Sequence, residues 1–255
     1  MITHQLSNSY GNYNYNAFVY TDISWTSHFH GNYELIYAIE SNTRITVNGT
    51  VYLLTPGDFL LIAPYSVHSM AIKGASKVWI GVFSEDYVTE FSRSQKGARF
   101  SVFRCDEKIE EFLKEYLLFE GRPERYICIA CLNAVCSECV RNGEKQNAES
   151  DTRFAEAVIE FISSNIQENI SMSQVADALG YEYHYFSYLF NKYFSLKFKS
   201  FINQFRFQHA CSLLADNRKS ISDVCFECGF ETVRNFNRIF KELSGTTPSV
   251  YRKNI

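Results

Sequence analysis

The hydrophobic and polar positions between Ser171 and Tyr251 form one pattern that occurs twice. In each copy, small or apolar residues recur at helical spacing, a glycine follows, and a second helical period begins. Each copy therefore predicts a short helix, a turn and a second helix. The positions that correspond are Ser171 with Ser220, Val175 with Val224, Gly180 with Gly229, Glu182 with Glu231, Phe186 with Phe236, and Phe190 with Phe240.

The residues at the expected helix ends support this interpretation. Ser171 and Gln174 have the spacing of an N-terminal capping pair, and so do Ser220 and Asp223. Thr232 can cap the last helix of the second copy. The two glycines stand where a left-handed residue ends a helix.

The second helix of each copy presents a polar outer face. A helix-turn-helix that exposes such a face is typical of proteins that enter the DNA major groove. In the second copy, Phe236, Ile239 and Phe240 are expected to face inward. The outer positions are Val233, Arg234, Asn237 and Arg238 in the second copy, and Tyr183, His184, Ser187 and Tyr188 in the first.

This stretch resembles the DNA-binding domain of AraC-type transcription regulators, in which a long helix joins two helix-turn-helix units. The resemblance covers about a hundred residues, and a joining helix is expected over 198–215, ~27 Å long. The signature residues are Ile221, Val224, Gly229, Phe230, Phe236, Arg238, Phe240, Lys241, Gly245, Thr247, Pro248, Tyr251 and Arg252, with Phe201, Ile202, Arg206, Ala210, Leu213 and Leu214 in the joining helix.

The resemblance implies that the eight outer residues contact bases. Arginine can recognise guanine and asparagine can recognise adenine through paired hydrogen bonds. Tyr188 stands where the family often has arginine, so the first unit is expected to be the weaker of the two in recognising bases. In the alternative, Tyr183 and Tyr188 are partly buried. Phosphate contacts, which position a protein without specifying sequence, are expected from Lys192, Lys197, Lys199, Lys241 and Arg252.

Residues 1–103 predict a β-domain. Strands are expected over 33–39, 43–47, 50–54, 59–62 and 78–83, and Asn48-Gly49 predicts a tight hairpin. Many short strands separated by Gly and Pro indicate a barrel or a jelly roll.

The histidines add a second resemblance, to the two cupin motifs. The metal ligands of metal-binding cupins would correspond to His28, His30, Glu34 and His68. Three imidazoles and a carboxylate suit Fe, Mn, Ni, Cu or Zn. Three interpretations stay open: an effector pocket that requires no metal, a bound divalent metal, and catalysis. Ser69 to Ile72 lack the asparagine that many cupin enzymes carry after the last histidine.

Residues 104–141 change to a helical period, with one expected helix before Gly121 and another over 126–140. These helices either pair two subunits or pack on the barrel. Residues 142–151 are polar and unpatterned, which predicts an interdomain linker before a DNA-binding domain over 152–255.

Charge and cysteine content refine this picture. From Thr152 onward, the chain has 12 Lys and Arg and 10 Asp and Glu, which gives a net charge of +2. The rest of the chain has a net charge of −5. Cys128, Cys131, Cys136 and Cys139 would share one helix face, but the outer two would lie ~16 Å apart, too far for one zinc ion. Buried unpaired thiols are expected instead. No apolar run reaches membrane length, and a cytoplasmic location is expected.

The sequence thus predicts an α+β protein of two domains. We expect a transcription regulator that binds promoter DNA, responds to a small-molecule effector and forms a homodimer, with no membrane segment, no catalytic residue and no required cofactor. The alternatives are a metal-dependent cupin enzyme fused to a DNA-binding domain, and a DNA-binding scaffold whose sealed barrel is only a dimer platform.

Overall fold

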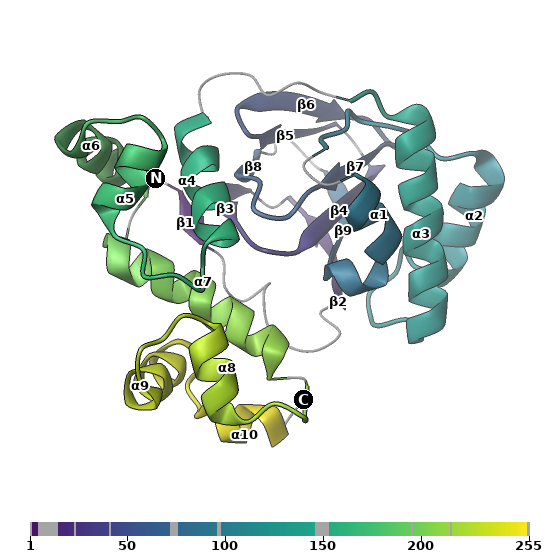
Figure 1. The fold of residues 1–255 in the computed structure, drawn as a ribbon. Coiled ribbons are helices and arrows are strands. Elements are labelled where there is room, and N and C mark those ends of the chain that lie inside the picture. The colour runs from purple at the N-terminus through teal and green to yellow at the C-terminus, as the bar shows by residue number, and fades with distance from the viewer. Residues whose placement is uncertain are drawn as a thin grey trace. The chain divides into compact units, whose positions relative to one another are not determined.

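In the computed structural model, the strands and helices separate into two units, residues 13–153 and residues 154–255 (Figure 1). Residues 2–4 group with the second unit. The structure describes residues 2–4, 15–22, 24–40, 42–71, 76–95, 98–145, 153–194, 196–214 and 216–253. Ile2 donates its N–H to the carbonyl of Tyr193, 2.7 Å away, which places this residue with the helical unit.

The first unit contains two antiparallel sheets, which confirms the predicted β-domain. One sheet has the order β2-β9-β4-β7, and β3, β8, β5 and β6 follow one another in the other. The five predicted strands are present as β4, β5, β6, β7 and β9, whereas β2, β3 and β8 are not among the predicted strands. The strands of this unit are β2 (Tyr15–Thr21), β3 (Trp25–Phe29), β4 (Tyr33–Glu40), β5 (Thr43–Val47), β6 (Thr50–Leu54), β7 (Phe59–Ile62), β8 (His68–Ala71) and β9 (Lys77–Phe83).

Strand β4 buries both of its faces, and this determines where its polar residue lies. Ile36 and Ala38 belong to the core between the sheets, together with Ile45 and Met70 from the opposite sheet. The intervening residues of β4 belong to the core beneath the helices. Because successive side chains alternate across a strand, Glu34 shares the face of Ile36 and points between the sheets.

Helices cover the outer face of the β2-β9-β4-β7 sheet (Figure 1). They are η2 (Glu85–Tyr87), α1 (Thr89–Ser94), α2 (Glu107–Tyr116) and α3 (Arg125–Asn142). The four cysteines of α3 lie in this core, and all eight cysteines of the chain are buried and unpaired. Packing on the sheet is therefore one role of α2 and α3, and subunit pairing stays a prediction.

The described part of the first unit extends past the predicted start of the linker. Helix α3 continues to Asn142, and Ser101 then donates its N–H to the carbonyl of Glu144 at 2.9 Å. Residues 142–145 thus belong to the β-unit, and the rest of the predicted linker lies outside the described residues.

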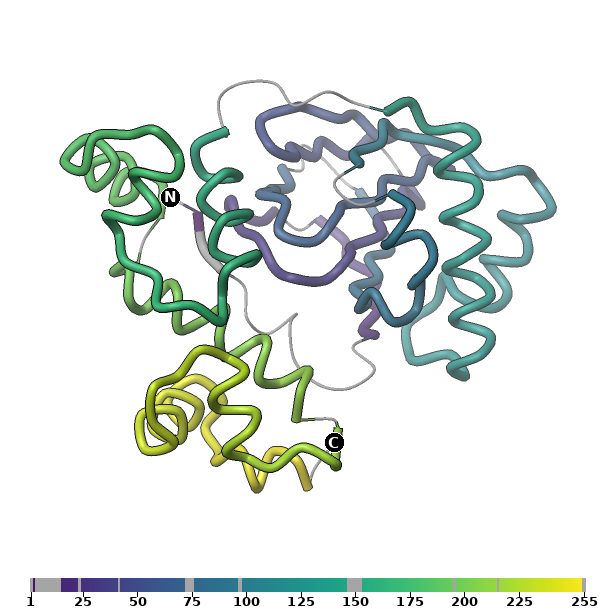
Figure 2. Tube along the Cα trace, in the orientation of Figure 1, coloured from purple at the N-terminus to yellow at the C-terminus, as the bar shows by residue number. Residues whose placement is uncertain are grey.

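The second unit contains two similar helical halves joined by α7, as predicted (Figure 2). Its elements are β1 (Thr3–His4), α4 (Arg153–Ser164), α5 (Met172–Ala178), α6 (Tyr183–Tyr193), α7 (Phe198–Leu213), α8 (Ile221–Glu227), α9 (Val233–Ser244) and α10 (Pro248–Lys253). None of the helices in the described part of the chain has the length and apolar character that a membrane span needs.

The predicted helix ends are present in the second unit. Ser171 and Ser220 each form a complete capping box, and the Thr232 hydroxyl accepts a hydrogen bond from the Asn235 N–H. Gly180 and Gly229 have φ of 74° and 77°, in the left-handed region that favours glycine. Local signals in the sequence therefore fix the boundaries of both helix-turn-helix units.

Candidate nucleic-acid interface and ligand site

Helix α6 presents aromatic side chains to solvent. The buried face carries Phe186 and Phe190. On the other face, Tyr183, Tyr185 and Tyr188 are 47%, 55% and 61% exposed. Tyr183 and Tyr188 thus lie on the surface and not in the core. Tyr185 is a candidate that the sequence analysis missed, although its spacing of three from Tyr188 places both on one side of a helix. Their rings stack with centroids 6.5 Å apart.

Helix α9 presents a different chemistry. Phe236, Ile239 and Phe240 are buried, as predicted, while Arg234 and Arg238 are exposed. Val233 and Asn237 are half-buried beside them. Three of the four predicted outer residues thus have side chains that form hydrogen bonds, and two of those side chains are cationic. Helices α6 and α9, the second helices of the two units and the candidate recognition helices, differ in charge although their backbones are arranged alike.

A contact through Gly229 holds the second half against the first. A Cβ atom on Gly229 would lie 2.5 Å from the carbonyl oxygen of Ile166, so only glycine fits without a shift. Arg206 of α7 donates from Nη2 to the carbonyl of Glu168 at 2.7 Å, and its guanidinium lies over the ring of Phe230. The spacing of the two recognition helices is therefore held by packed side chains and backbone.

Four of the five predicted phosphate-contacting residues are exposed: Lys192, Lys197, Lys199 and Lys241. Arg252 differs from its prediction. Its Nε donates to the carbonyl of Leu214 at 3.0 Å, and its Nη2 is buried. The arginine satisfies a carbonyl at the end of α7, which a helix leaves without a partner of its own. Arg252 thus links α10 to the end of α7, and its contact with phosphate stays a prediction.

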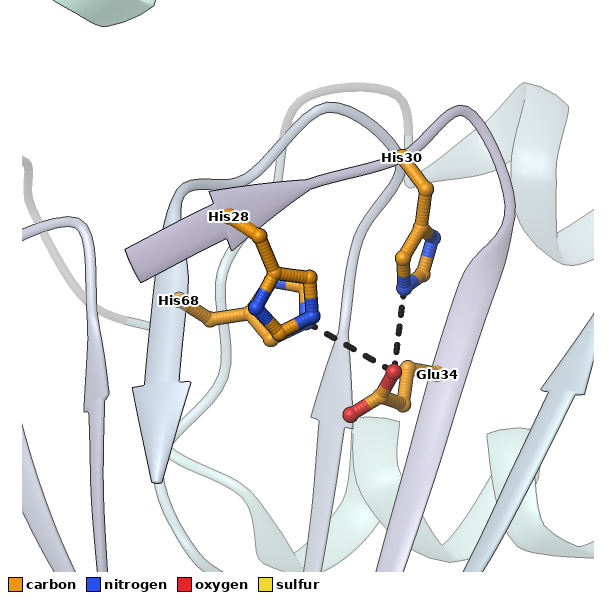
Figure 3. A group of neighbouring side chains, drawn as sticks. All are labelled: His28, His30, Glu34 and His68. Carbon is orange, nitrogen blue, oxygen red and sulfur yellow. Dashed lines mark hydrogen bonds and ion pairs between the residues drawn. The ribbon is translucent and has the colours of Figure 1, made fainter. Parts of the chain in front are cut away.

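The predicted ligand residues of the β-unit come together (Figure 3). His28 lies on β3, His30 just beyond it, Glu34 on β4 and His68 at the start of β8. Their exposed fractions are 7%, 1%, 4% and 4%. One ligand atom from each lies within 4.8 Å of all the others. His28 and His68 are cross-strand partners, which accounts for their approach.

Backbone carbonyls fix the orientation of all three rings. Nδ1 of each histidine faces the carbonyl oxygen of a residue two positions away in the sequence. The distances are 2.9 Å from His28 to Thr26, 3.1 Å from His30 to Asn32, and 2.8 Å from His68 to Ser66. A carbonyl only accepts hydrogen bonds, so Nδ1 carries the proton in each ring. Nε2 is then the nitrogen available to a ligand, as in metal-binding histidines whose second nitrogen is held by the protein.

Burial and the neighbouring charges shift the pKa values in opposite directions. Burial lowers the pKa of His28 to about 4 and also lowers that of His30. Burial opposes the charged form of Glu34 too, but the adjacent His68 and His30 outweigh it and lower the Glu34 pKa. Burial likewise opposes protonation of His68, yet Glu34 raises the His68 pKa. The cluster is therefore a carboxylate surrounded by imidazoles.

The donor set fits a transition-metal ion. Three imidazole nitrogens and one carboxylate are ligands that such ions accept. Two ligands at ~2.1 Å from one tetrahedral ion lie ~3.4 Å apart, so ligand atoms separated by as much as 4.8 Å need to approach one another by about 1.4 Å. The Nε2 atom of His68 has no hydrogen-bond partner and lies 3.5 Å from Glu34 Oε2. A cation at the centre would satisfy this buried atom.

Comparison with known proteins agrees with both units. Residues 18–158 match the family model of the AraC-like ligand binding domain, and residues 175–254 match a helix-turn-helix domain. The melibiose operon regulatory protein of Escherichia coli (strain K12) is 20% identical over 252 residues, covering 89% of this chain and 83% of its own. The HTH-type transcriptional regulator YtdP of Bacillus subtilis (strain 168) is 27% identical over 113 residues.

The extent of these matches varies. The match to YtdP covers 43% of this chain and only 15% of the length of that regulator. Among solved structures, ToxT from Vibrio cholerae aligns over 93% of this chain and 97% of its own, with a TM-score of 0.44 and 14% identity.

Two helix-turn-helix units on one connecting helix, next to a two-sheet domain of the ligand-binding type, define a DNA-binding transcription regulator with a ligand-binding domain. The chain belongs to the AraC family of transcription regulators.

Proposed function

We propose that α6 and α9 recognise promoter DNA and that the cluster of His28, His30, Glu34 and His68 binds the signal to which the regulator responds. A divalent transition-metal ion is the ligand that this cluster fits. The outer residues of the two recognition helices contact bases, and the four exposed lysines contact phosphates. The effector of the ligand-binding domain is then the ion itself or a small molecule that binds with it.

The surroundings of His30 carry the proposal for the ion. Nδ1 faces the carbonyl of Asn32, and Nε2 lies 3.0 Å from Oε2 of Glu34. Both partners are acceptors when Glu34 is ionised, but a neutral imidazole has only one N–H. Because burial lowers the pKa of His30, the neutral ring is favoured. An ion between Nε2 and Oε2 satisfies both atoms at once.

The burial of the cluster supports sensing over catalysis. A catalytic metal keeps a coordination position open to substrate. Here all four side chains are at most 7% exposed, and together they supply the ligands of a complete shell for a tetrahedral ion such as Zn²⁺. When bound, the ion would link β3, β4 and β8, because its ligands lie on or beside these strands. Such a link changes the stability of the sensor domain without any reaction.

The experiment is metal analysis of the full chain purified without chelator, followed by titration of the chelator-treated protein with Zn²⁺, Co²⁺ and Ni²⁺. We expect about one ion per chain and a raised melting temperature. His30→Ala should abolish both effects, whereas His184→Ala, a change at an exposed histidine of α6, should abolish neither. Stoichiometric binding that His30→Ala leaves intact would contradict the assignment of the site.

Subunit pairing is a separate part of the proposal. Tyr126 is 78% exposed at the start of α3, and Ile127 and Val140 on the same helix are also exposed. Apolar side chains grouped on one helix are a common interface feature. Light scattering of the wild-type chain and of Tyr126→Ser tests this directly: a homodimer that the substitution weakens would support it, and a wild-type monomer at high concentration would exclude it.

A further inference from the structure

The guanidinium of Arg238 is held by its neighbours on α9 from two sides. Its Nη1 donates to Oε2 of Glu242 at 3.1 Å, and its Nη2 donates to Oδ1 of Asn235 at 3.0 Å. Asn235, Arg238 and Glu242 are spaced by three and four residues, which places them along one helix face. The Asn235 N–H in turn donates to the Thr232 hydroxyl that caps the helix. A continuous chain of hydrogen bonds thus runs from the N-cap to the last turn.

Helix stability does not account for Glu242. A carboxylate in the last turn of a helix interacts unfavourably with the helix dipole. A pair in which the cation precedes the anion by four residues is also the weaker orientation. Both groups are exposed, where an ion pair contributes little to folding. In addition, an acidic side chain on a face directed to DNA repels phosphates.

The two contacts leave enough N–H donors on Arg238 for a contact with a DNA base. A guanidinium has five N–H donors, and Glu242 and Asn235 each use one of them. Three donors are left, and a bidentate contact to guanine needs two. Holding the long side chain in one orientation before DNA arrives reduces the conformational entropy that binding would otherwise cost.

We propose that Asn235 and Glu242 are positioning residues for Arg238, which fix its guanidinium and thereby set base specificity at one operator position. This inference rests on the proposed role of Arg238 in base recognition. It assigns two further residues, neither of which touches a base, to the specificity of the second helix-turn-helix unit. It also gives Glu242 two opposing effects: it strengthens base preference and weakens binding to DNA of any sequence.

The test compares base preferences of full-length variants selected on a randomised duplex library. Arg238→Ala first identifies the operator position that the arginine recognises. Glu242→Gln replaces the charged acceptor with a neutral amide oxygen, which weakens the hydrogen bond from Arg238 Nη1. It should lower guanine preference at that same position by roughly three- to tenfold. Its affinity for unrelated duplex DNA should rise, because one negative charge near the phosphates is lost. Asn235→Ala should lower the same preference.

Asp216→Asn is the matched control. Asp216 accepts two hydrogen bonds from the guanidinium of Arg218 in the segment between α7 and α8, outside α9. This control removes the same charge beside an arginine of the same unit, so it should leave base preference unchanged. Equal preferences in Glu242→Gln and wild type would overturn the positioning role while leaving Arg238 as a base-contacting residue. If Arg238→Ala itself changes no preference, the base-recognition role fails and the inference fails with it.

Discussion

Gly180 and Gly229 occupy corresponding positions of the two repeats, but their surroundings differ. Both have a left-handed backbone, which costs an alanine roughly 1–2 kcal/mol. At Gly180 a Cβ atom would meet nothing within 4 Å. At Gly229 it would lie 2.5 Å from the Ile166 carbonyl oxygen and 3.0 Å from that of Gln167. Those oxygens belong to the backbone and cannot rotate away.

We therefore expect Gly229→Ala to destabilise the helical unit by more than Gly180→Ala, by roughly 2–5 kcal/mol against 1–2 kcal/mol. Urea denaturation of both variants measures the difference. Equal losses would show that the contact between Gly229 and the first half is not maintained in solution.

The assignment of base and phosphate contacts gives a second prediction at this scale. Arg238→Ala should lose roughly 1–3 kcal/mol of specific binding and relax preference at one position. Lys241→Ala removes a cation from the same helix but should weaken binding to all sequences about equally. Competition experiments with selected and unrelated duplexes distinguish the two patterns, and identical behaviour of the variants would refute the division.

Individual side chains were predictable where their role is local. Ser171, Ser220 and Thr232 cap helices as their spacing predicts, because a cap needs only the next few residues. Arg252 was assigned to phosphate because the sequence shows its charge but not its neighbours. The carbonyl of Leu214, 38 residues earlier, holds it, and only the packed fold brings the two together.

At the level of elements, the predicted strands are those with a strong local signal. Asn48 and Gly49 both have positive φ and close the β5–β6 hairpin in the predicted register. Strand β2 was missed because its seven pairs all join it to β9, about sixty residues later. Strand β8 has only four residues and begins with a histidine. Long-range pairing, and not local pattern, determines both.

The burial of the cysteines predicts that their thiols react slowly in the native protein. Burial raises the pKa of Cys128 to about 12 and that of Cys131 to about 11, so few molecules carry a reactive thiolate. Native protein should react very slowly with a thiol reagent, and all eight thiols should react in denaturant. Rapid labelling of the native chain at one or more sites would show that the segment carrying the labelled cysteine opens locally.

For the molecule as a whole, the independence of the two units is testable. A fragment of residues 153–255 contains both helix-turn-helix units and α4, so it should fold and bind DNA. Its affinity should fall steeply with salt, because lysines and arginines displace counterions. It lacks Ile2, which is buried in this unit, and we therefore expect it to be less stable than the full chain by about 1–2 kcal/mol. A folded fragment without salt-sensitive DNA binding would contradict the assignment of the interface.

Communication between the units depends on the segment that connects them. The predicted linker is polar, and a polar segment without an apolar anchor cannot act as a rigid lever. A ligand of the β-unit must then act by changing which protein surfaces are free. It can shift that balance only by its differential affinity for the two states.

Insertion of a short Gly/Ser segment between residues 146 and 152 distinguishes these mechanisms. We expect DNA affinity to stay nearly unchanged and the response to the bound ion to fall only modestly, because a longer flexible tether lowers the effective concentration of one unit near the other only gradually. A rigid connection predicts complete loss of the response. The measurement is DNA affinity with and without the ion, before and after insertion. The control is His30→Ala, which should show no response to the ion with or without the insertion. If the inserted chain binds DNA normally but no longer responds to the ion, the flexible mechanism is refuted.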